Sequence, residues 1–250
     1  MPAFALLAAS LPLRIASLNL CTDEYLLLLA EPSRIASVSY LSKDQRESPL
    51  WKVARRYPGN RGSLEDVLPL RPDLILTMGG GGRGSALLAG RLRIRSIDLP
   101  SPVNIAGVAA NLRTVAAAVG NPNAANPLIA RLKSLQARSP ASAADTVWVS
   151  GGGASLSPTS PGAQWLRLAG YRQRVLSGGR LTFETVLTNP PKVLIRSNYR
   201  SGQMSAGARW LGNPIIRHSL SRHLLTDGRP WTCMGPLMIP EIERLRSAAR

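Results

Sequence analysis

Cysteine and histidine are almost absent from this chain of 250 residues, which contains two of each. It has no Cys-x-x-Cys or His-Glu-x-x-His motif and no cluster of carboxylates, so we predict no bound catalytic metal. It also lacks the Gly-x-Ser-x-Gly motif of serine hydrolases. His218 and His223 lie five residues apart, a spacing that places them poorly on one helix face, and we predict surface positions for both. Together these absences predict a protein that has no catalytic residues and is not an enzyme.

Long apolar runs are also missing, although hydrophobic residues make up 44% of the chain and exclude a disordered protein. No run reaches the roughly 18 residues that a membrane span requires. Residues 1–10 resemble the apolar core and small-residue end of a secretory signal, without its basic start. We therefore predict that residues 1–13 are the remnant of a truncated signal, with an ordinary apolar lead-in to a strand as the alternative. Two cysteines are too few for a disulfide scaffold, but one pair would suit an exported protein.

Acidic residues are scarce, with 14 against 31 lysines and arginines, which gives a formal net charge of +17. Such a charge favours nucleic acid, anionic lipid or an acidic ligand as a partner. However, the basic residues are scattered and never form a run of five. We therefore favour a basic but otherwise ordinary surface and expect no nucleic acid, and we keep nucleic-acid binding as an alternative that rests on charge alone.

One feature that is present is an internal repeat, because residues 61–76 and 180–195 align without a gap. The identical pairs are Arg61/Arg180, Glu65/Glu184, Val67/Val186, Leu68/Leu187 and Pro72/Pro191. In each copy, a good N-cap residue, Ser63 or Thr182, precedes a short helix, and the shared proline ends it before a buried strand. The repeat predicts two lobes of similar build, each with one exposed glutamate at the same place.

The rest of the chain alternates apolar strands with helical segments, the pattern of a parallel α/β protein. We predict two similar α/β lobes with parallel-type central sheets at residues 14–103 and 140–250, joined by helices over residues 104–139. Pro127 is unfavourable inside a helix, so we expect the connection to break or begin again there. Residues 19–22 are predicted as a loop, with Thr22 capping the helix that follows.

The glycine-rich stretch at residues 79–84 allows an alternative function. Gly79, Gly81 and Gly84 fit Gly-x-Gly-x-x-Gly between a predicted strand and a predicted helix, and Asp98 ends the next strand. A nucleotide-dependent α/β enzyme is therefore the alternative. A glycine-rich run matches this pattern easily, and the helix that follows is short for a dinucleotide site, so an ordinary loop is favoured.

Aromatic residues amount to only 5% of the chain, so three in loop or strand-end positions stand out: Tyr40, Trp51 and Trp231. Each could stack against a flat ligand in a cleft. Packing over the core of a lobe is about equally favoured for Trp51. It is less favoured for Tyr40, which ends a parallel strand where open α/β sheets bind ligands.

Four segments, at residues 14–19, 37–40, 60–65 and 70–76, resemble the periplasmic substrate-binding proteins for vitamin B12 and ferric siderophores, of the class III, helical-backbone type. The likeness extends from about residue 14 to the C-terminus and is strongest in the first hundred residues. It implies two α/β lobes with a ligand cleft between them, joined by a long, rather rigid helix. It further implies a periplasmic monomer that delivers a chelate to an ABC permease dimer in the inner membrane. The chelate would be cobalamin or another corrinoid, a ferric siderophore or haem, carried as a cobalt- or iron-containing ligand, with no resident cofactor.

The resemblance also assigns roles to individual residues. Tyr40 matches a tyrosine that contacts the corrin in the vitamin B12 binder, and residues 229–233 match its contact loop in the second lobe. The ligand-binding residues implied in this way are Asn19, Cys21, Tyr40, Trp231, Thr232 and Cys233.

The two glutamates of the repeat, Glu65 and Glu184, fall on the positions that dock onto arginine pockets of the two permease subunits in this family. Local pairing with Arg61 and Arg180 is the alternative, and exposed pairs of that kind contribute at most about 1 kcal/mol. From the positions of Cys21 and Cys233, one in each lobe and both in loops facing the cleft, we hypothesise a disulfide that ties the lobes together, or else two free thiols near the ligand.

Overall fold

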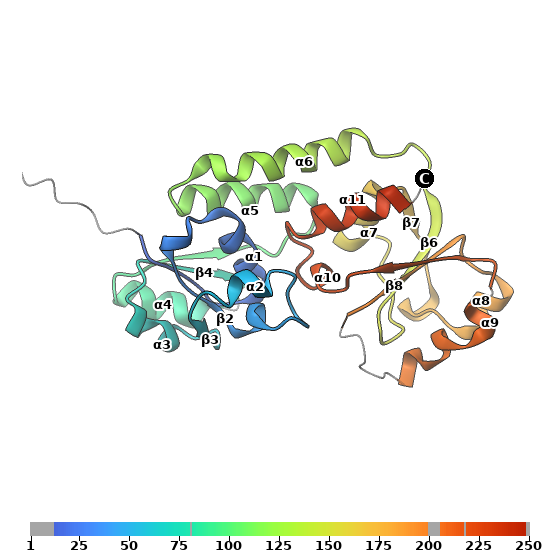
Figure 1. The fold of residues 1–250 in the computed structure, drawn as a ribbon, viewed down its shortest axis with the longest axis horizontal. Helices are drawn as coiled ribbons and strands as arrows, with labels where there is room; N and C mark the ends of the chain where they lie inside the picture. The colour runs from blue at the N-terminus through green and yellow to red at the C-terminus, as the bar shows by residue number, and fades with distance from the viewer. Residues whose placement is uncertain (1–12, 81, 200–205, 218, 249–250) are drawn as a thin grey trace, which may run out of the picture.

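The computed structural model describes residues 13–80, 82–199, 206–217 and 219–248 (Figure 1). Residues 1–12, most of the segment predicted to be a signal remnant, lie outside these ranges, as do Gly81 and His218. The described chain forms two lobes side by side, with long helices along one side of the molecule (Figure 1).

The first lobe is built on a five-stranded parallel sheet with the strand order β3-β2-β1-β4-β5. Its strands are β1 (Ile15–Ser17), β2 (Ile35–Ser39), β3 (Gly59–Asn60), β4 (Leu74–Met78) and β5 (Arg95–Leu99). Its helices are α1 (Leu20–Leu29), α2 (Trp51–Ala54), α3 (Leu64–Val67) and α4 (Arg83–Arg91), with 3₁₀ turns η1 (Pro32–Arg34), η2 (Tyr40–Lys43) and η3 (Leu68–Leu70). Every residue of the central strands β1, β2 and β4 is buried, because helices cover both faces of the sheet, as is usual for parallel sheets.

The second lobe repeats this plan with a four-stranded parallel sheet in the order β7-β6-β8-β9. Its strands are β6 (Ala144–Val149), β7 (Tyr171–Gln173), β8 (Val193–Ser197) and β9 (Arg222–Thr226). Its helices are α7 (Pro161–Leu168), α8 (Phe183–Thr188), α9 (Pro214–Arg217), α10 (Pro230–Cys233) and α11 (Met238–Ala248), with 3₁₀ segments η5 (Ser177–Gly179) and η6 (Ala206–Gly212). The predicted fold class, two similar α/β lobes with parallel sheets, is confirmed.

The internal repeat occupies the same place in both lobes. In the first lobe α3 leads into β4, which pairs with β1 and β5, and in the second α8 leads into β8, which pairs with β6 and β9. Both predicted N-caps form: the side chain of Ser63 accepts a hydrogen bond from Asp66 N, and that of Thr182 accepts one from Thr185 N. The short helices are thus started by local side-chain chemistry that can be recognised in the sequence.

The connection between the sheets consists of α5 (Ile105–Ala118), the turn η4 (Pro122–Ala125) and α6 (Asn126–Ala137). The helices α5 and α6 lie side by side along the top of the molecule (Figure 1), and α6 leads back toward the second lobe. The helix start expected at Pro127 is confirmed, because this proline lies in the first turn of α6, where its missing N–H is not needed. The connection is therefore a helical hairpin, not the single long helix that the family resemblance implies.

A continuous apolar core runs through both lobes and the connecting helices. It joins Ile15 and Leu74 of the first sheet to Leu112 of α5, Leu132 of α6 and Ile242 of α11. Two smaller clusters lie beneath α3 and α4 in the first lobe and beneath α8 and α9 in the second. Within the described ranges, no helix is both long and apolar enough to cross a membrane.

Candidate functional site

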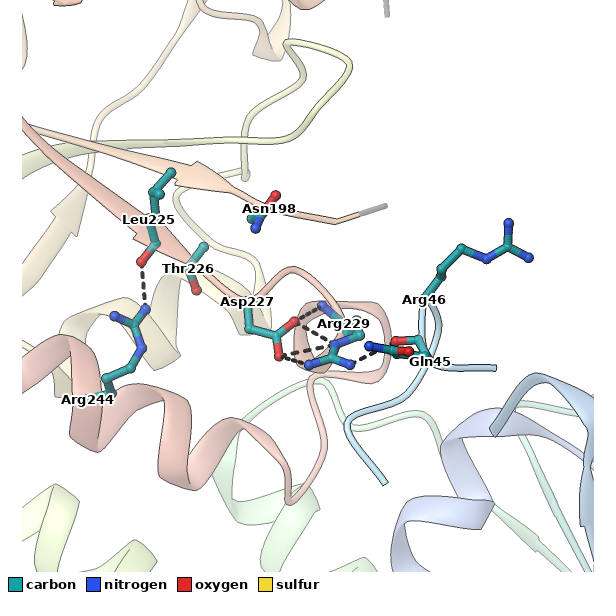
Figure 2. A pocket seen from close by; sticks show the side chains of 8 residues that line it. All are labelled: Gln45, Arg46, Asn198, Leu225, Thr226, Asp227, Arg229 and Arg244. Carbon is teal, nitrogen blue, oxygen red and sulfur yellow. Dashed lines mark hydrogen bonds and ion pairs between the residues drawn. The ribbon is translucent and has the colours of Figure 1, made fainter. Parts of the chain in front are cut away.

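The carboxyl ends of strands from the second sheet face a loop of the first lobe across a cavity of about 490 Å³. Its lining residues are Gln45, Arg46, Asn198, Leu225, Thr226, Asp227, Arg229 and Arg244 (Figure 2). Asn198 directly follows β8, Thr226 ends β9, and Gln45 belongs to the segment after β2 and η2. Open parallel sheets bind their ligands beyond the carboxyl ends of the strands, so this region between the lobes is the candidate site.

Three arginines line this cavity, and each forms an ion pair within its own lobe. Arg46 pairs with Asp44 at 2.7 Å, Arg229 with Asp227 at 2.6 Å and Arg244 with Glu241 at 2.6 Å.

Hydrogen bonding to Asp227 raises the pKa of Arg229 above its ordinary value, so this guanidinium stays charged at all physiological pH values. The side chain of Arg46 is 75% exposed, and Figure 2 shows it extending away from Asp227 and Arg229. The cavity therefore offers N–H donors to an oxygen-rich ligand without a large excess of charge.

Hydrogen bonds fasten the first-lobe segment at residues 44–50 to the second lobe. The guanidinium of Arg229 donates to the backbone oxygens of Gln45 at 2.8 Å and Ser48 at 3.4 Å. The hydroxyl of Tyr199 donates to the carboxylate of Glu47. One wall of the cleft is thus held by contacts between residues that are about 150 to 180 positions apart in the sequence.

The hypothesis of a disulfide between the lobes is confirmed. Cys21 of α1 and Cys233 of α10 are bonded, with their Cα atoms 5.3 Å apart and 212 positions between them in the sequence. The predicted loop at residues 19–22 is wrong, because the side chain of Asn19, not Thr22, caps α1 by accepting from Thr22 N at 2.9 Å. Cys21 therefore lies in the first helical turn. Neither sulfur is a free thiol that could bind a metal.

Tyr40 lies directly after β2 with 57% of its surface exposed, and it is not among the residues that line the cavity. The preceding residue, Ser39, is held by Asp23 of α1. Ser39 N donates to both carboxylate oxygens of Asp23 at 3.1 Å, and its hydroxyl donates to Oδ2 at 2.5 Å. Asp23 is only 1% exposed, and burial raises its pKa to about 7.

Trp231 does not have the exposed loop position expected for it. Residues 230–233 form the helix α10, and Trp231 is only 4% exposed. Its ring centroid lies 5.1 Å from that of Trp148, and its indole N–H donates to the hydroxyl of Thr226 at 2.8 Å. Its ring therefore has no free face for a ligand, because the core of the second lobe covers it. The neighbouring Thr232 is exposed.

Both glutamates of the repeat are exposed in the first turns of α3 and α8. Among the residues that the structure describes, no ion pair joins Glu65 or Glu184 to an arginine. The alternative of local pairing fails for Arg180, whose guanidinium donates to Gly152 O at 2.6 Å. Both carboxylates therefore point into solvent from helix N-termini.

The glycine-rich loop does not have the geometry of a nucleotide site. It joins β4 to α4, and α4 has only nine residues, which is short for the helix of a dinucleotide site. The carboxylate of Asp98 accepts from Gly80 N at 2.9 Å and from the hydroxyl of Thr77 at 2.7 Å, so it holds the loop itself. A Cβ at position 82 would lie 2.5 Å from Thr77, so the side chain of Thr77 occupies that space. Gly81 lies outside the described residues.

Sequence reasoning missed the residues that hold the cleft together. Arg229, Glu47 and Tyr199 act across a distance in the chain that no local pattern reveals. Asp23 did leave a signal in the sequence, because it and Glu24 are adjacent acids in a mostly apolar segment. In the structure both are buried, at 1% and 3% exposure. Buried carboxylates in such a helix indicate hydrogen-bonded partners elsewhere.

Comparisons with solved structures identify the same architecture in binding proteins. The haem-binding protein HutB of Vibrio cholerae is 17% identical with a TM-score of 0.75, covering 96% of this chain and 99% of that one. The siderophore-binding protein BauB, solved with ferric iron and two acinetobactin molecules, is 18% identical with a TM-score of 0.70, covering 96% and 93%. The vitamin B12-binding protein BtuF of Vibrio cholerae is 18% identical with a TM-score of 0.63, covering 94% and 95%. At these identities the likeness shows the fold.

Family membership follows from the sequence profile. A comparison with curated proteins finds no match. The profile of the periplasmic binding protein family matches residues 15–147, which is more than half of the chain. That family consists of binding proteins, not enzymes. The two-lobed architecture, the cleft and the matching profile agree, and the chain belongs to the periplasmic binding protein family.

Proposed function

We propose that this protein is the periplasmic binding component of an ABC importer and captures a metal chelate in the cleft between its lobes. The observation that carries this proposal is the pair of parallel sheets with a cavity beyond the carboxyl ends of β8 and β9. The structural neighbours bind haem, a ferric siderophore and vitamin B12, which supports a cobalt or iron chelate as the ligand class. The chelate is the transported ligand, not a resident cofactor, and the protein is a non-enzymatic monomer.

Two kinds of group fit such a ligand, one on the wall of the cavity and one at the carboxyl end of β2, outside the cavity lining. The exposed ring of Tyr40 offers an apolar face to a planar or bulky chelate, and Arg46 offers charged N–H donors to carboxylate or phenolate oxygens. Asn19 and Thr232 flank the disulfide and complete the proposed ligand-binding set. Cys21 and Cys233 would contact the ligand only through their disulfide, since neither has a free thiol.

We further propose that Glu65 and Glu184 dock onto a permease dimer in the inner membrane. They occupy equivalent positions in two lobes of similar build, which suits a receptor with two-fold symmetry. Nucleic-acid binding has no comparable structural support.

Titration with cyanocobalamin, haemin and a panel of ferric siderophores, followed by tryptophan quenching, tests the ligand class. We expect binding of at least one chelate at micromolar concentration or tighter. Tyr40→Ser should weaken that binding by about tenfold, because it removes an aromatic contact worth roughly 1 kcal/mol or more. Leu87→Ser is the control, since Leu87 of α4 is an apolar residue of the same lobe and is 74% exposed. If no chelate binds at micromolar concentrations, the proposed ligand class is wrong.

A further inference from the structure

We infer that Asp23 is a positioning residue for ligand binding, because it holds the turn that presents Tyr40 and thereby makes ligand affinity dependent on pH. This inference rests on the proposed function, in which Tyr40 contacts the ligand. It adds a residue that touches neither the cleft nor the ligand.

The geometry begins with the two elements that Asp23 joins. Asp23 belongs to the first turn of α1, and Ser39 is the last residue of β2, immediately before Tyr40. Ser39 directs both its backbone N–H and its hydroxyl at the one carboxylate, at 3.1 Å and 2.5 Å. Hydrogen bonds from its backbone and from its side chain therefore fix the position of Ser39, where the chain leaves the sheet.

A second hydroxyl extends this network into the turn that carries Tyr40. Ser42 of η2 donates its hydroxyl to Ser39 O at 2.9 Å. Asp23, Ser39 and Ser42 are all at most 3% exposed, whereas Tyr40 between them is 57% exposed. The buried hydrogen bonds of Asp23, Ser39 and Ser42 therefore fix the backbone on both sides of Tyr40, and this backbone sets the direction of the exposed ring.

The anchor contains a group that can change its hydrogen bonding. An ionised carboxylate accepts both donors of Ser39, whereas a protonated carboxyl group has one oxygen that becomes a donor. A proton on Oδ2 removes the acceptor of the Ser39 hydroxyl, and a proton on either oxygen replaces hydrogen bonds to a charged group with weaker ones. Burial raises the pKa of Asp23 to about 7, although the hydroxyls of Ser17, Ser39 and Ser42 oppose the shift.

The charged groups around Asp23 do not replace this role. Glu24, the next residue on α1, repels the charge of Asp23, but its side chain lies against Gly235 and the backbone of Leu237, in the segment between α10 and α11. Lys43 of η2 donates to Tyr57 O at 2.6 Å. The groups of β1 and β2 that face Asp23 are the uncharged hydroxyls of Ser17 and Ser39.

The test compares Asp23→Asn with the wild-type protein at pH 5.5 and 8.5, with haemin, cyanocobalamin and ferrichrome as probes. For a probe that binds, we expect wild-type affinity to be about tenfold weaker at pH 5.5, since hydrogen bonds to a charged group are stronger than those to a neutral one. Asp23→Asn should show the weaker affinity at both pH values, because an amide imitates the protonated carboxyl group. Equal affinities and equal pH profiles in the two proteins would overturn the inference.

Matched variants isolate the effect. Asp98→Asn makes the same change at an exposed carboxylate that also accepts from a hydroxyl and a backbone N–H, and it should keep the wild-type profile. Glu24→Gln should keep it as well. If Glu24→Gln abolishes the pH dependence and Asp23→Asn does not, the assignment to Asp23 is wrong.

A measurement without ligand separates this inference from the proposed function. With 4-trifluoromethylphenylalanine in place of Tyr40, the ¹⁹F resonance should shift between pH 5.5 and 8.5 with a midpoint near 7. The Asp23→Asn background should abolish the shift, and Asp98→Asn should not. If none of the three probes binds to wild-type protein, the proposed ligand class fails, while the ¹⁹F shift still decides whether Asp23 positions residue 40.

Discussion

At the scale of single residues, the main feature is a pair of buried acids on α1. Asp23 and Glu24 are adjacent in sequence but serve different contacts, Asp23 within the first lobe and Glu24 toward the backbone of Leu237. Burial raises the pKa of both carboxyl groups, which means that the folded protein holds their protons more tightly than the unfolded chain does. The ionised form of Asp23 thus costs stability while it improves the anchoring of Ser39.

This relation predicts the sign of a pH effect on stability. A raised folded-state pKa contributes stability that is fully present below the unfolded value of 3.8 and is lost as pH rises through about 7. For Asp23, this raised pKa corresponds to a change of roughly 4 kcal/mol in the free energy of unfolding. We therefore expect Asp23→Asn to gain stability relative to wild type as pH rises from 4 to 8, measured by urea unfolding at each pH.

The measured quantity is the difference in unfolding free energy between Asp23→Asn and wild type at each pH, because the net charge of both proteins also changes with pH. Asp98→Asn serves as the reference for a general effect of removing one exposed acid. A constant difference between Asp23→Asn and wild type across this pH range would contradict the assigned pKa shift.

At the scale of elements, the repeated short helices α3 and α8 are the informative feature. Neither is long enough to be stable alone, so each depends on its N-cap and on packing against the next helix. Leu64 and Val67 pack with Ala89 of α4, and Val186 packs with Ile216 of α9. The inner face of each helix is buried in this way, and the glutamate in its first turn is left facing outward.

The docking proposal is tested at these elements. We expect Glu65→Ala combined with Glu184→Ala to abolish uptake of the chelate while ligand affinity stays unchanged, because the two carboxylates contact the permease and not the ligand. Radiolabelled uptake in cells and titration of the purified variant measure the two effects separately. Glu31→Ala, an exposed acid of the first lobe outside the repeat, is the control and should transport normally. Unchanged uptake by the double variant would refute the role.

At the scale of the whole molecule, the lobes are joined by more than the connecting helices. The apolar core continues from the first sheet through α5 and α6 to α11, and the disulfide joins α1 to α10. The contacts of Arg229 with Gln45 and of Tyr199 with Glu47 add polar links at the cleft. We therefore expect small movements of one lobe relative to the other.

The disulfide should contribute strongly to stability, because its cysteines are 212 positions apart in the sequence. Closing so long a loop restricts the unfolded chain, and we expect Cys21→Ala with Cys233→Ala to lose about 4 kcal/mol in urea unfolding. The wild-type protein should show the same loss after reduction with dithiothreitol, whereas the double variant should be insensitive to it. Equal stability of the oxidised wild type and the double variant would contradict the expectation.

Much of the fold could be predicted because its signals are local. The N-caps Ser63 and Thr182, the helix start near Pro127 and the buried strands all depend on neighbours within a few residues. The candidate site could be predicted only in part. The exposed position of Tyr40 after a strand was predicted, and its contact with a ligand stays a prediction. Trp231 was misplaced because its burial depends on Trp148, which is 83 positions away in the sequence.

The sequence by itself determined the α/β class, the two-lobe plan and the outward glutamates, because periodicity, capping and an internal repeat act over short stretches of chain. Only the tertiary structure decided which side chains face the cleft, that Cys21 and Cys233 meet, and that Asp23 anchors the turn of Tyr40. These features join residues from separate strands and lobes, and their energies come from burial and from hydrogen bonds that exist only once the lobes have packed.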